Sequence, residues 1–256
     1  MNVIITFRNH ENPFIPIEAE MITPDAFLEE KNEICVAVGN RSYPLSEVAD
    51  FSIVGEASSV DDIEVLIRGD TSRVKRVGEY MTGGAITIEG DIGMHCGNFM
   101  SGGLIEVLGS ADGWLGREMK GGEIICHGDA GDYCASGYRG GRRGMRGGSV
   151  EVFGSVGDFA CEHIAGGEVL IHGNTGDFAC AEMKGGTVTI LGDTSRVCAN
   201  MSAGTCYVYG SAEEMIPTFE MKGVVDNNGL LFHHFKGDVA NRGNGDLYTA
   251  RFTYLQ

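Results

Sequence analysis

The chain has 256 residues, a formal net charge of −17 and 40 glycines against 5 prolines. Such an acidic chain repels nucleic acid and anionic membrane surfaces, so soluble proteins are its expected partners. The sequence contains neither a run of 18 apolar residues nor a basic, apolar leader, which predicts a cytoplasmic protein without membrane insertion. None of the eight cysteines forms a C-x-x-C pair, and we expect reduced thiols.

Residues 1–60 lie outside the periodic part of the chain. Thr23-Pro24-Asp25 predicts the start of a short helix, because proline is favoured in the first helical turn. Cys35–Val38 then alternates in the manner of a strand. We expect this segment to cap the first repeat.

Residues 61–210 contain an internal repeat that is marked by glycine pairs. The pairs are 19 residues apart except for one step of 26, which contains a seven-residue insertion, and they begin at Gly83, Gly102, Gly121, Gly147, Gly166 and Gly185. Between the glycines lie short alternating segments such as Ala85–Glu89, which predict strands with one buried face. A unit this small cannot bury its own apolar face, so the copies must stack. The predicted fold is all-β, a right-handed parallel β-helix with about 19 residues per repeat and small capping segments at both ends.

Alignment of the repeats turns equivalent positions into columns. Two columns of aliphatic residues are predicted to face inward, and Cys126 takes the place of a valine in one of them. A third, less regular inward column is expected to contain Cys96, Leu115, Cys134, Ala160, Ala179 and Cys198. Cys161 and Cys180 lie one repeat apart and are expected to form a structural thiol pair.

An apolar column is predicted to face outward, and it contains Leu108, His127, Phe153, His172, Leu191 and Tyr209. Leu104, Ile125, Leu170 and Tyr207 are predicted on the same face. An exposed apolar patch of this kind indicates a surface for a partner protein, with coverage by the chain's own ends as the alternative. Because Phe153 separates His127 from His172, we do not expect the two histidines to share a ligand.

Another column forms an aromatic ladder, with His95, Trp114, Tyr133, Phe159, Phe178 and Val197. Stacked rings are a common packing solution, although a sugar-binding platform has the same pattern. Asp132, Asp158 and Asp177 recur beside the turns, where aspartate usually binds backbone groups. A carbohydrate-active enzyme that uses these carboxylates is the alternative. Because packing explains the aromatic ladder and backbone binding explains the aspartates, we expect no catalytic, cofactor-binding or metal-binding residue in the chain.

The seven-residue insertion is the most basic part of the chain. Tyr138 begins it, and the arginines are Arg139, Arg142, Arg143 and Arg146. Arginine binds carboxylate and phosphate through a planar fork, so we expect contact with an acidic subunit or an anionic ligand. A solvated basic loop is the alternative. Residues 211–256, with Leu230–Phe232 and Leu247-Tyr248, are expected to cap the other end or to wrap a partner.

The repeat resembles the glycine-repeat domain of the glutamate synthase large subunit. A closer resemblance covers nearly the whole chain, and it is to the C subunit of formylmethanofuran dehydrogenase. It rests on Ile15–Ala19 with Thr23–Phe27, on Gly128–Tyr133 with Tyr138–Gly140 and Arg143–Met145, and on Gly237–Ala240.

The resemblance implies a structural subunit of an oxidoreductase complex that reduces CO2 and fixes it onto methanofuran in methanogenesis. It implies that other subunits hold a tungsten or molybdenum pterin, iron–sulfur clusters and a dinuclear metal site. The implied partners are the metal-pterin subunit, the amidohydrolase subunit and the electron-transfer partners of the larger complex. A bacterial formyltransferase/hydrolase complex uses a similar subunit and is the alternative.

Overall fold

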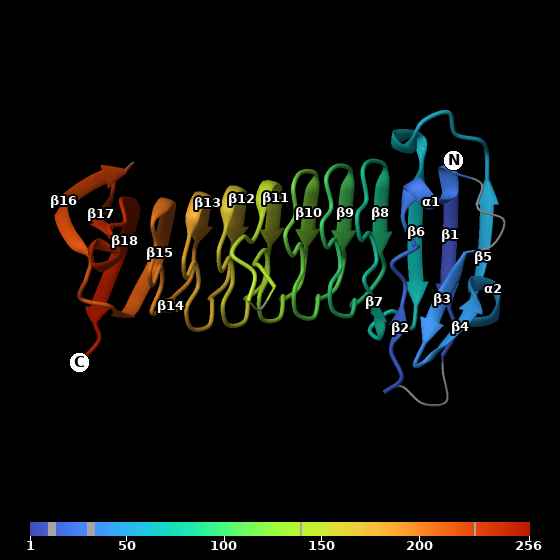
Figure 1. Cartoon of the computed structure of the whole chain (residues 1–256), viewed down its shortest axis with the longest axis horizontal. Coiled ribbons are helices and arrows are strands. Elements are labelled where there is room, and N and C mark those ends of the chain that lie inside the picture. Colours follow the sequence, from blue (N-terminus) through green and yellow to red (C-terminus); the bar gives the residue numbers. More distant parts are fainter. Residues whose placement is uncertain (10–13, 30–33, 139, 228) are drawn as a thin grey trace.

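The computed structural model describes residues 1–9, 14–29, 34–138, 140–227 and 229–256. The protein is predominantly β, and most of its strands belong to one 14-stranded sheet. Figure 1 shows the strands of the repeat side by side along the long axis, with the two ends of the chain at opposite ends of the molecule. In these ranges no helix combines the length and the apolar character needed to cross a membrane.

One parallel strand comes from each repeat. In chain order these are β6 (Glu64–Gly69), β8 (Ala85–Ile88), β9 (Leu104–Val107), β10 (Glu123–Cys126), β11 (Arg146–Val152), β12 (Ala165–Ile171), β13 (Lys184–Ile190) and β15 (Ala203–Met215). Each strand pairs with the next, and equivalent residues lie opposite each other, as Ile86 lies opposite Ile105. A second series of parallel bridges runs from Ile92 through Ala111, Ala130 and Val156 to Thr175. Each repeat therefore bonds to its neighbours at two places.

The inward columns are buried as the sequence predicts. Twelve side chains from two strand positions are at most 2 % exposed, and they are Ile86, Ile105, Ile124, Val150, Val169, Val188, Ile88, Val107, Cys126, Val152, Ile171 and Ile190. Burial of one such aliphatic side chain stabilises the fold by about 1.5–3 kcal/mol. The core therefore forms only when repeats stack, because a single repeat is too small to bury its own apolar side chains.

Polar side chains at the turns bind the backbone of the following repeat. Asp132 Oδ1 accepts a hydrogen bond from Asp158 N at 2.8 Å, and Asp158 Oδ1 accepts one from Asp177 N at 2.8 Å. Asp129 Oδ1 does the same for Ser155 N at 2.7 Å in a neighbouring column. The predicted backbone role is therefore confirmed for Asp132 and Asp158, although the bond joins two repeats and does not stay within one turn. The carboxylate of Asp177 instead accepts from Arg196 Nη1 at 2.9 Å.

The N-terminal segment extends the large sheet. Strand β1 (Asn2–Phe7) pairs parallel with β6 and antiparallel with β5 (Ala49–Val54). The predicted helix is α1 (Pro24–Leu28), whose Ala26 N donates to the Thr23 hydroxyl oxygen. A second sheet has the order β4 (Arg41–Pro44), β3 (Cys35–Val38), β2 (Ile17–Glu18) and β7 (Val74–Lys75). Helix α2 (Leu45–Val48) and the 3-10 turn η1 (Val60–Asp62) complete the segment.

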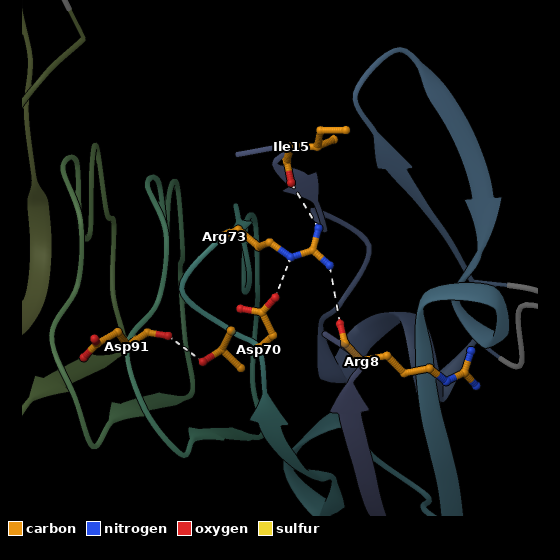
Figure 2. A network of polar contacts seen from close by, with 6 residues as sticks. Arg8, Ile15, Asp70, Arg73 and Asp91 are labelled. Atoms are coloured by element: carbon orange, nitrogen blue, oxygen red, sulfur yellow. Dashed lines mark hydrogen bonds and ion pairs between the residues drawn. The ribbon is translucent and has the colours of Figure 1, made fainter. Parts of the chain in front are cut away.

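Arg73 joins this segment to the first repeat (Figure 2). Its guanidinium donates to Asp70 Oδ2 at 2.8 Å, to the Ile15 carbonyl at 3.0 Å and to the Arg8 carbonyl at 3.4 Å. The side chain is only 7 % exposed, so its charge is compensated by Asp70 and by two carbonyl dipoles. One arginine thus fixes the backbone of two N-terminal residues against the turn before β7.

The C-terminal segment continues the sheet beyond the last repeat. Strand β18 (Gly245–Tyr254) pairs parallel with β15, and β17 (Leu230–Gly237) and β16 (Glu220–Asn227) follow it antiparallel. The short strand β14 (Thr194–Ser195) pairs with β15, and the 3-10 turn η2 (Val239–Asn241) joins β17 to β18. The edge strand β16 is exposed along nearly its whole length.

The repeat that begins at Asp177 is one residue shorter than the aligned columns of the sequence predict. Asp177 lies opposite Ser195, so Arg196 takes the place next to Phe178 and lies 5.5 Å from the centre of its ring. The expectation that Val197 continues the aromatic ladder is therefore wrong. Cys198 also moves by one position, and its backbone nitrogen bonds Ala179 O in the same way that Cys180 N bonds Ala160 O. Its assignment to the column of Cys96 and Cys134 is wrong for the same reason.

We predict that contact between repeats makes Gly102→Ala costly. A Cβ on Gly102 would lie 2.2 Å from the Thr82 carbonyl oxygen, so the backbone of one repeat would have to move. Gly229 is the control, because it has a φ of +89° but nothing within 4 Å of an added Cβ. Thermal or urea unfolding should show a loss of about 2–3 kcal/mol for Gly102→Ala and about 1 kcal/mol for Gly229→Ala. Equal losses would contradict the close-approach argument.

The aromatic ladder makes a prediction about acid stability. Burial lowers the pKa of His95 to about 4, and the charge of Arg117 acts in the same direction. The unfolded chain then takes up a proton near pH 6.5 that the folded chain does not take up, so stability falls between pH 6.5 and pH 4. His95→Phe, which copies Phe159 and Phe178, should remove about 1–2 kcal/mol of this acid-side loss, since His95 is only partly buried. Urea titrations at pH 7 and pH 4.5 measure it, and an identical loss of stability in both proteins would refute it.

Candidate interaction surface

The outward column lies directly after strands β9 to β13 and ends at Tyr209 on β15, and its central rings stack on one another. The rings of His127 and Phe153 lie 5.3 Å apart, and those of Phe153 and His172 lie 4.5 Å apart, both nearly parallel. Leu108 is 48 % exposed, Phe153 45 % and Leu191 38 %. We call the column from Leu108 to Leu191 the outer stack.

Each histidine of the outer stack is held by a carboxylate. His127 Nε2 lies 2.8 Å from Glu106 Oε1, and His172 Nε2 lies 2.7 Å from Glu151 Oε1. Each glutamate comes from the preceding repeat and the adjacent column. Phe153 fills the space between the two imidazoles, so the geometry gives no shared ligand position. The carboxylates orient the imidazoles, whose faces stack on Phe153, so that a partner would meet the edges of the rings.

The C-terminal segment covers only the end of this face. Tyr207 stacks on Tyr248 at 4.9 Å, and Tyr248 stacks on His234 at 4.5 Å. Tyr209 meets the edge of Phe232 at 5.0 Å and remains 37 % exposed. Self-coverage therefore applies at Tyr207 and in part at Tyr209. Leu104, Ile125 and Leu170 are half-buried beside the outer stack.

The arginine insertion is anchored at both ends and exposed in the middle. Gly137 N donates to Glu162 O at 3.1 Å, and Gly144 N donates to His163 O at 2.8 Å. The Arg117 guanidinium lies between the rings of Phe99 and Tyr138, 4.6 and 4.9 Å from their centres.

Three arginines of the insertion face solvent. Arg142, Arg143 and Arg146 are exposed, and no carboxylate within the described ranges forms an ion pair with them. Lys184 Nζ donates to the Arg142 carbonyl, which fixes the backbone and leaves the guanidinium free of that contact. Arg139 lies outside the described residues. The insertion therefore presents positive charge that the surrounding fold does not neutralise.

Two further apolar surfaces were not predicted from the sequence. Phe51, Ile53 and Val54 are 46–66 % exposed on the edge strand β5. At the other end Met221, Val224, Val225, Leu230 and Leu231 are exposed on the β16–β17 hairpin. Their sequence signal is apolar alternation in segments outside the repeat, but only the tertiary structure shows that β5 and β16 are the two edges of the sheet.

Metal-ligating chemistry is found at one place in the described core. The sulfur atoms of Cys180, Cys198 and Cys206 all lie within 4.8 Å of one another, and all three side chains are buried.

A cavity of about 150 Å³ lies at the N-terminal end, where Arg8, Ile17, Val38 and Arg73 contribute to its walls. Ligand sites usually measure at least about 300 Å³, so this cavity is too small for a pterin or a methanofuran-sized molecule.

Curated relatives of this chain include C subunits of formylmethanofuran dehydrogenases. The model of the GXGXG motif family matches residues 105–228. The C subunit of the tungsten-containing formylmethanofuran dehydrogenase 2 from Methanococcus maripaludis is 46 % identical over 255 residues, which cover 92 % of each chain. The C subunit of the molybdenum-containing enzyme 1 from Methanosarcina barkeri is 42 % identical over 85 residues, or 32 % of this chain and 28 % of that relative. The C subunit of the tungsten-containing enzyme 2 from Methanothermobacter marburgensis is 37 % identical over 92 residues, which cover 34 % of this chain and 33 % of that relative.

A solved structure has the same fold. One chain of the crystal structure of the formyltransferase/hydrolase complex from Methylorubrum extorquens, determined with methylofuran, superposes with a TM-score of 0.81 at 25 % identity. The match covers 95 % of this chain and 98 % of that one. With the M. maripaludis alignment over nearly its full length, the chain belongs to the family of formylmethanofuran dehydrogenase C subunits.

Proposed function

We propose that this chain is a non-catalytic structural subunit of a formylmethanofuran dehydrogenase complex, which reduces CO2 and fixes it onto methanofuran as N-formylmethanofuran. The observation that carries this proposal is the 46 % identity to the C subunit of the M. maripaludis enzyme over 92 % of both chains. The aligned segments span only about a third of the length of the M. barkeri and M. marburgensis relatives. The placement implies a cytoplasmic location.

The architecture proposed for this role is a right-handed parallel β-helix over residues 61–210. The parallel strand series and the second series of bridges support it, because both follow the same repeat. Residues 1–60 would cap one end, where β1 pairs with β6. Residues 211–256 would cap the other, where β18 pairs with β15. A rigid rod of this kind suits a subunit that holds other chains in a fixed arrangement.

The proposed cofactors belong to the other subunits. The names of the relatives specify molybdenum-containing and tungsten-containing enzymes, which indicates a metal-pterin elsewhere in the complex. The described residues of this chain do not fit such a group, because the cysteine cluster is sealed in the core and the N-terminal cavity is too small. The iron–sulfur clusters and the dinuclear site are likewise assigned to the partners.

The outer stack and the arginine insertion are the proposed contact surfaces. An exposed row of stacked aromatic and aliphatic side chains gives a partner a flat apolar surface at low entropic cost. The insertion adds guanidinium groups with no described carboxylate beside them, which suits an acidic subunit or an anionic ligand. The acidic remainder of the chain would then steer the orientation of the partner.

The second candidate is the structural subunit of a formyltransferase/hydrolase complex, which transfers formyl groups without CO2 reduction. The fold match to the M. extorquens complex favours it. Assay of the purified complex for CO2-dependent formylation of methanofuran separates the two candidates. A carbohydrate-active enzyme is disfavoured, since Asp132 and Asp158 each direct a carboxylate oxygen at the backbone of the next repeat.

Assembly tests the proposed function directly. Isolation of the native chain should recover larger metalloenzyme subunits with it, and Phe153→Asp should weaken this assembly at least tenfold, because it places a charge in the middle of the outer stack. Val239→Asp is the control, since Val239 is 48 % exposed on η2, away from that stack. Mass spectrometry of the native complex gives the composition. An inert monomer recovered from native cells would contradict the proposal.

The arginine insertion can be tested in the same complex. Charge reversal in the double variant Arg142→Glu with Arg143→Glu should weaken assembly or methanofuran turnover about tenfold, because attraction to an anionic partner becomes repulsion. Arg251→Glu, at a 73 % exposed side chain on β18, should have little effect. Binding titrations at two salt concentrations measure the electrostatic part. Wild-type assembly and kinetics in the double variant would show that the insertion is a solvated loop that contacts no partner.

A further inference from the structure

Four cysteines come together in the core of the last repeats. Cys161, Cys180, Cys198 and Cys206 are all fully buried, with no measurable exposure. The Sγ atoms of Cys180 and Cys206 lie 3.9 Å apart, and both lie within 4.8 Å of Cys198 Sγ. Cys161 is in hydrogen-bonding contact with Cys180 on its other side. Three of the sulfur atoms therefore converge in the buried core, and the fourth, that of Cys161, contacts the group through Cys180.

The register explains how three of them become neighbours. Cys161, Cys180 and Cys198 occupy the same turn position in successive repeats, each with a left-handed φ of 59–60°. The equivalent residues in earlier repeats are small, and they are Gly78, Gly97, Gly116 and Ala135. Cys206 enters from strand β15, where it lies opposite Val188. The cluster thus joins one turn column to one strand column.

A change in the strand column opens the space that the sulfur atoms occupy. A Cβ on Gly78 would lie 2.5 Å from Ile105 Cδ1, and a Cβ on Gly97 would lie 2.5 Å from Ile124 Cδ1. In later repeats valines replace these isoleucines and lack the Cδ1 methyl group, as at Val188 opposite Cys206. Alanine in the turn column and valine in the strand column would fill this volume equally well. Packing therefore accounts for small side chains here, but not for thiols at every position around one point.

The thiols also contact one another. Cys180 is in hydrogen-bonding contact with Cys161, Cys198 and Cys206. The four thiols therefore form one connected group in the core.

The geometry points to a buried, structural Zn²⁺ site in which Cys180, Cys198 and Cys206 supply three sulfur ligands, and Cys161, which contacts Cys180, is the nearest further sulfur for a fourth. Zn–S bonds of about 2.3 Å in a tetrahedral site separate two sulfur atoms by about 3.8 Å, close to the spacing of Cys180 and Cys206. An iron–sulfur cubane binds each cysteine to a different iron, so sulfur atoms this close suit a single ion.

The charge of the site favours a divalent ion. The buried arginine, Arg73, lies at the N-terminal end, so no described lysine or arginine is buried beside the cluster to balance several thiolates, and a bound Zn²⁺ neutralises more of their charge than Cu⁺ does. Binding releases the thiol protons to solvent and involves no change of oxidation state. Because the cluster is sealed, the ion enters as the last repeats fold. It would then stabilise the repeats on which β18 docks, whichever complex the chain joins.

The test counts zinc in the full chain. The chain is expressed in zinc-supplemented cells, washed with chelator and measured by native mass spectrometry, and one Zn²⁺ per chain is expected. Cys206→Val copies Val188 in the same column and should reduce the retained zinc at least tenfold. Cys126→Val is the matched control, because it copies Val107 in a strand column remote from the cluster and should keep the full equivalent.

Two further measurements keep the inference testable if Cys206→Val fails to fold. Cys180→Ala copies Ala135 in the turn column and should lose zinc in the same way. Growth with Co²⁺ should give thiolate-to-cobalt charge-transfer absorption in the wild-type chain and in Cys126→Val. A wild-type chain with eight reduced thiols and no bound metal would overturn the site. Equal zinc in Cys206→Val and Cys126→Val would overturn it as well, and so would a Cys180–Cys206 disulfide in the native chain.

Discussion

Backbone pairing between equivalent residues of successive repeats is the constraint on which the rest of this structure depends. Parallel strands lie about 4.8 Å apart, so every residue of a repeat meets its counterpart at that distance. Positions such as Gly102 tolerate no Cβ, since the carbonyl oxygen of Thr82 already occupies its place. The glycines therefore mark places where two repeats come into close contact as well as places where the backbone turns.

The same register organises the surface in columns. Similar side chains stack over one another, which produces parallel rings at His127, Phe153 and His172. The polar turn residues do the same, and Asp132 and Asp158 each bind the backbone of the next repeat. Side chains that look like catalytic carboxylates in the sequence thus serve to link repeats. Function is left to the surfaces that the stack exposes at its sides and ends.

The ends and the core of the stack differ in what they offer. At the N-terminal end Arg73 ties loop carbonyls to the first repeat, whereas the C-terminal end adds three strands to the sheet and leaves β16 open. In the last repeats the inward columns change from glycine and isoleucine to cysteine and valine. The core of the last repeats therefore contains a cluster of buried thiols next to the C-terminal segment.

The sequence by itself determined the repeat, the strand positions, the inward columns, the first helix and the outer stack, because glycine spacing and side-chain alternation are local signals. The predicted register beyond Phe178 is one residue out, although Gly192 and Gly210 lie 18 residues apart and so signal the shorter repeat that places Asp177 opposite Ser195. Only the tertiary structure brought Cys206 to Cys180 and made β5 and β16 the open edges. These features depend on contacts between columns and on which strands lack a neighbour, and no local pattern encodes either.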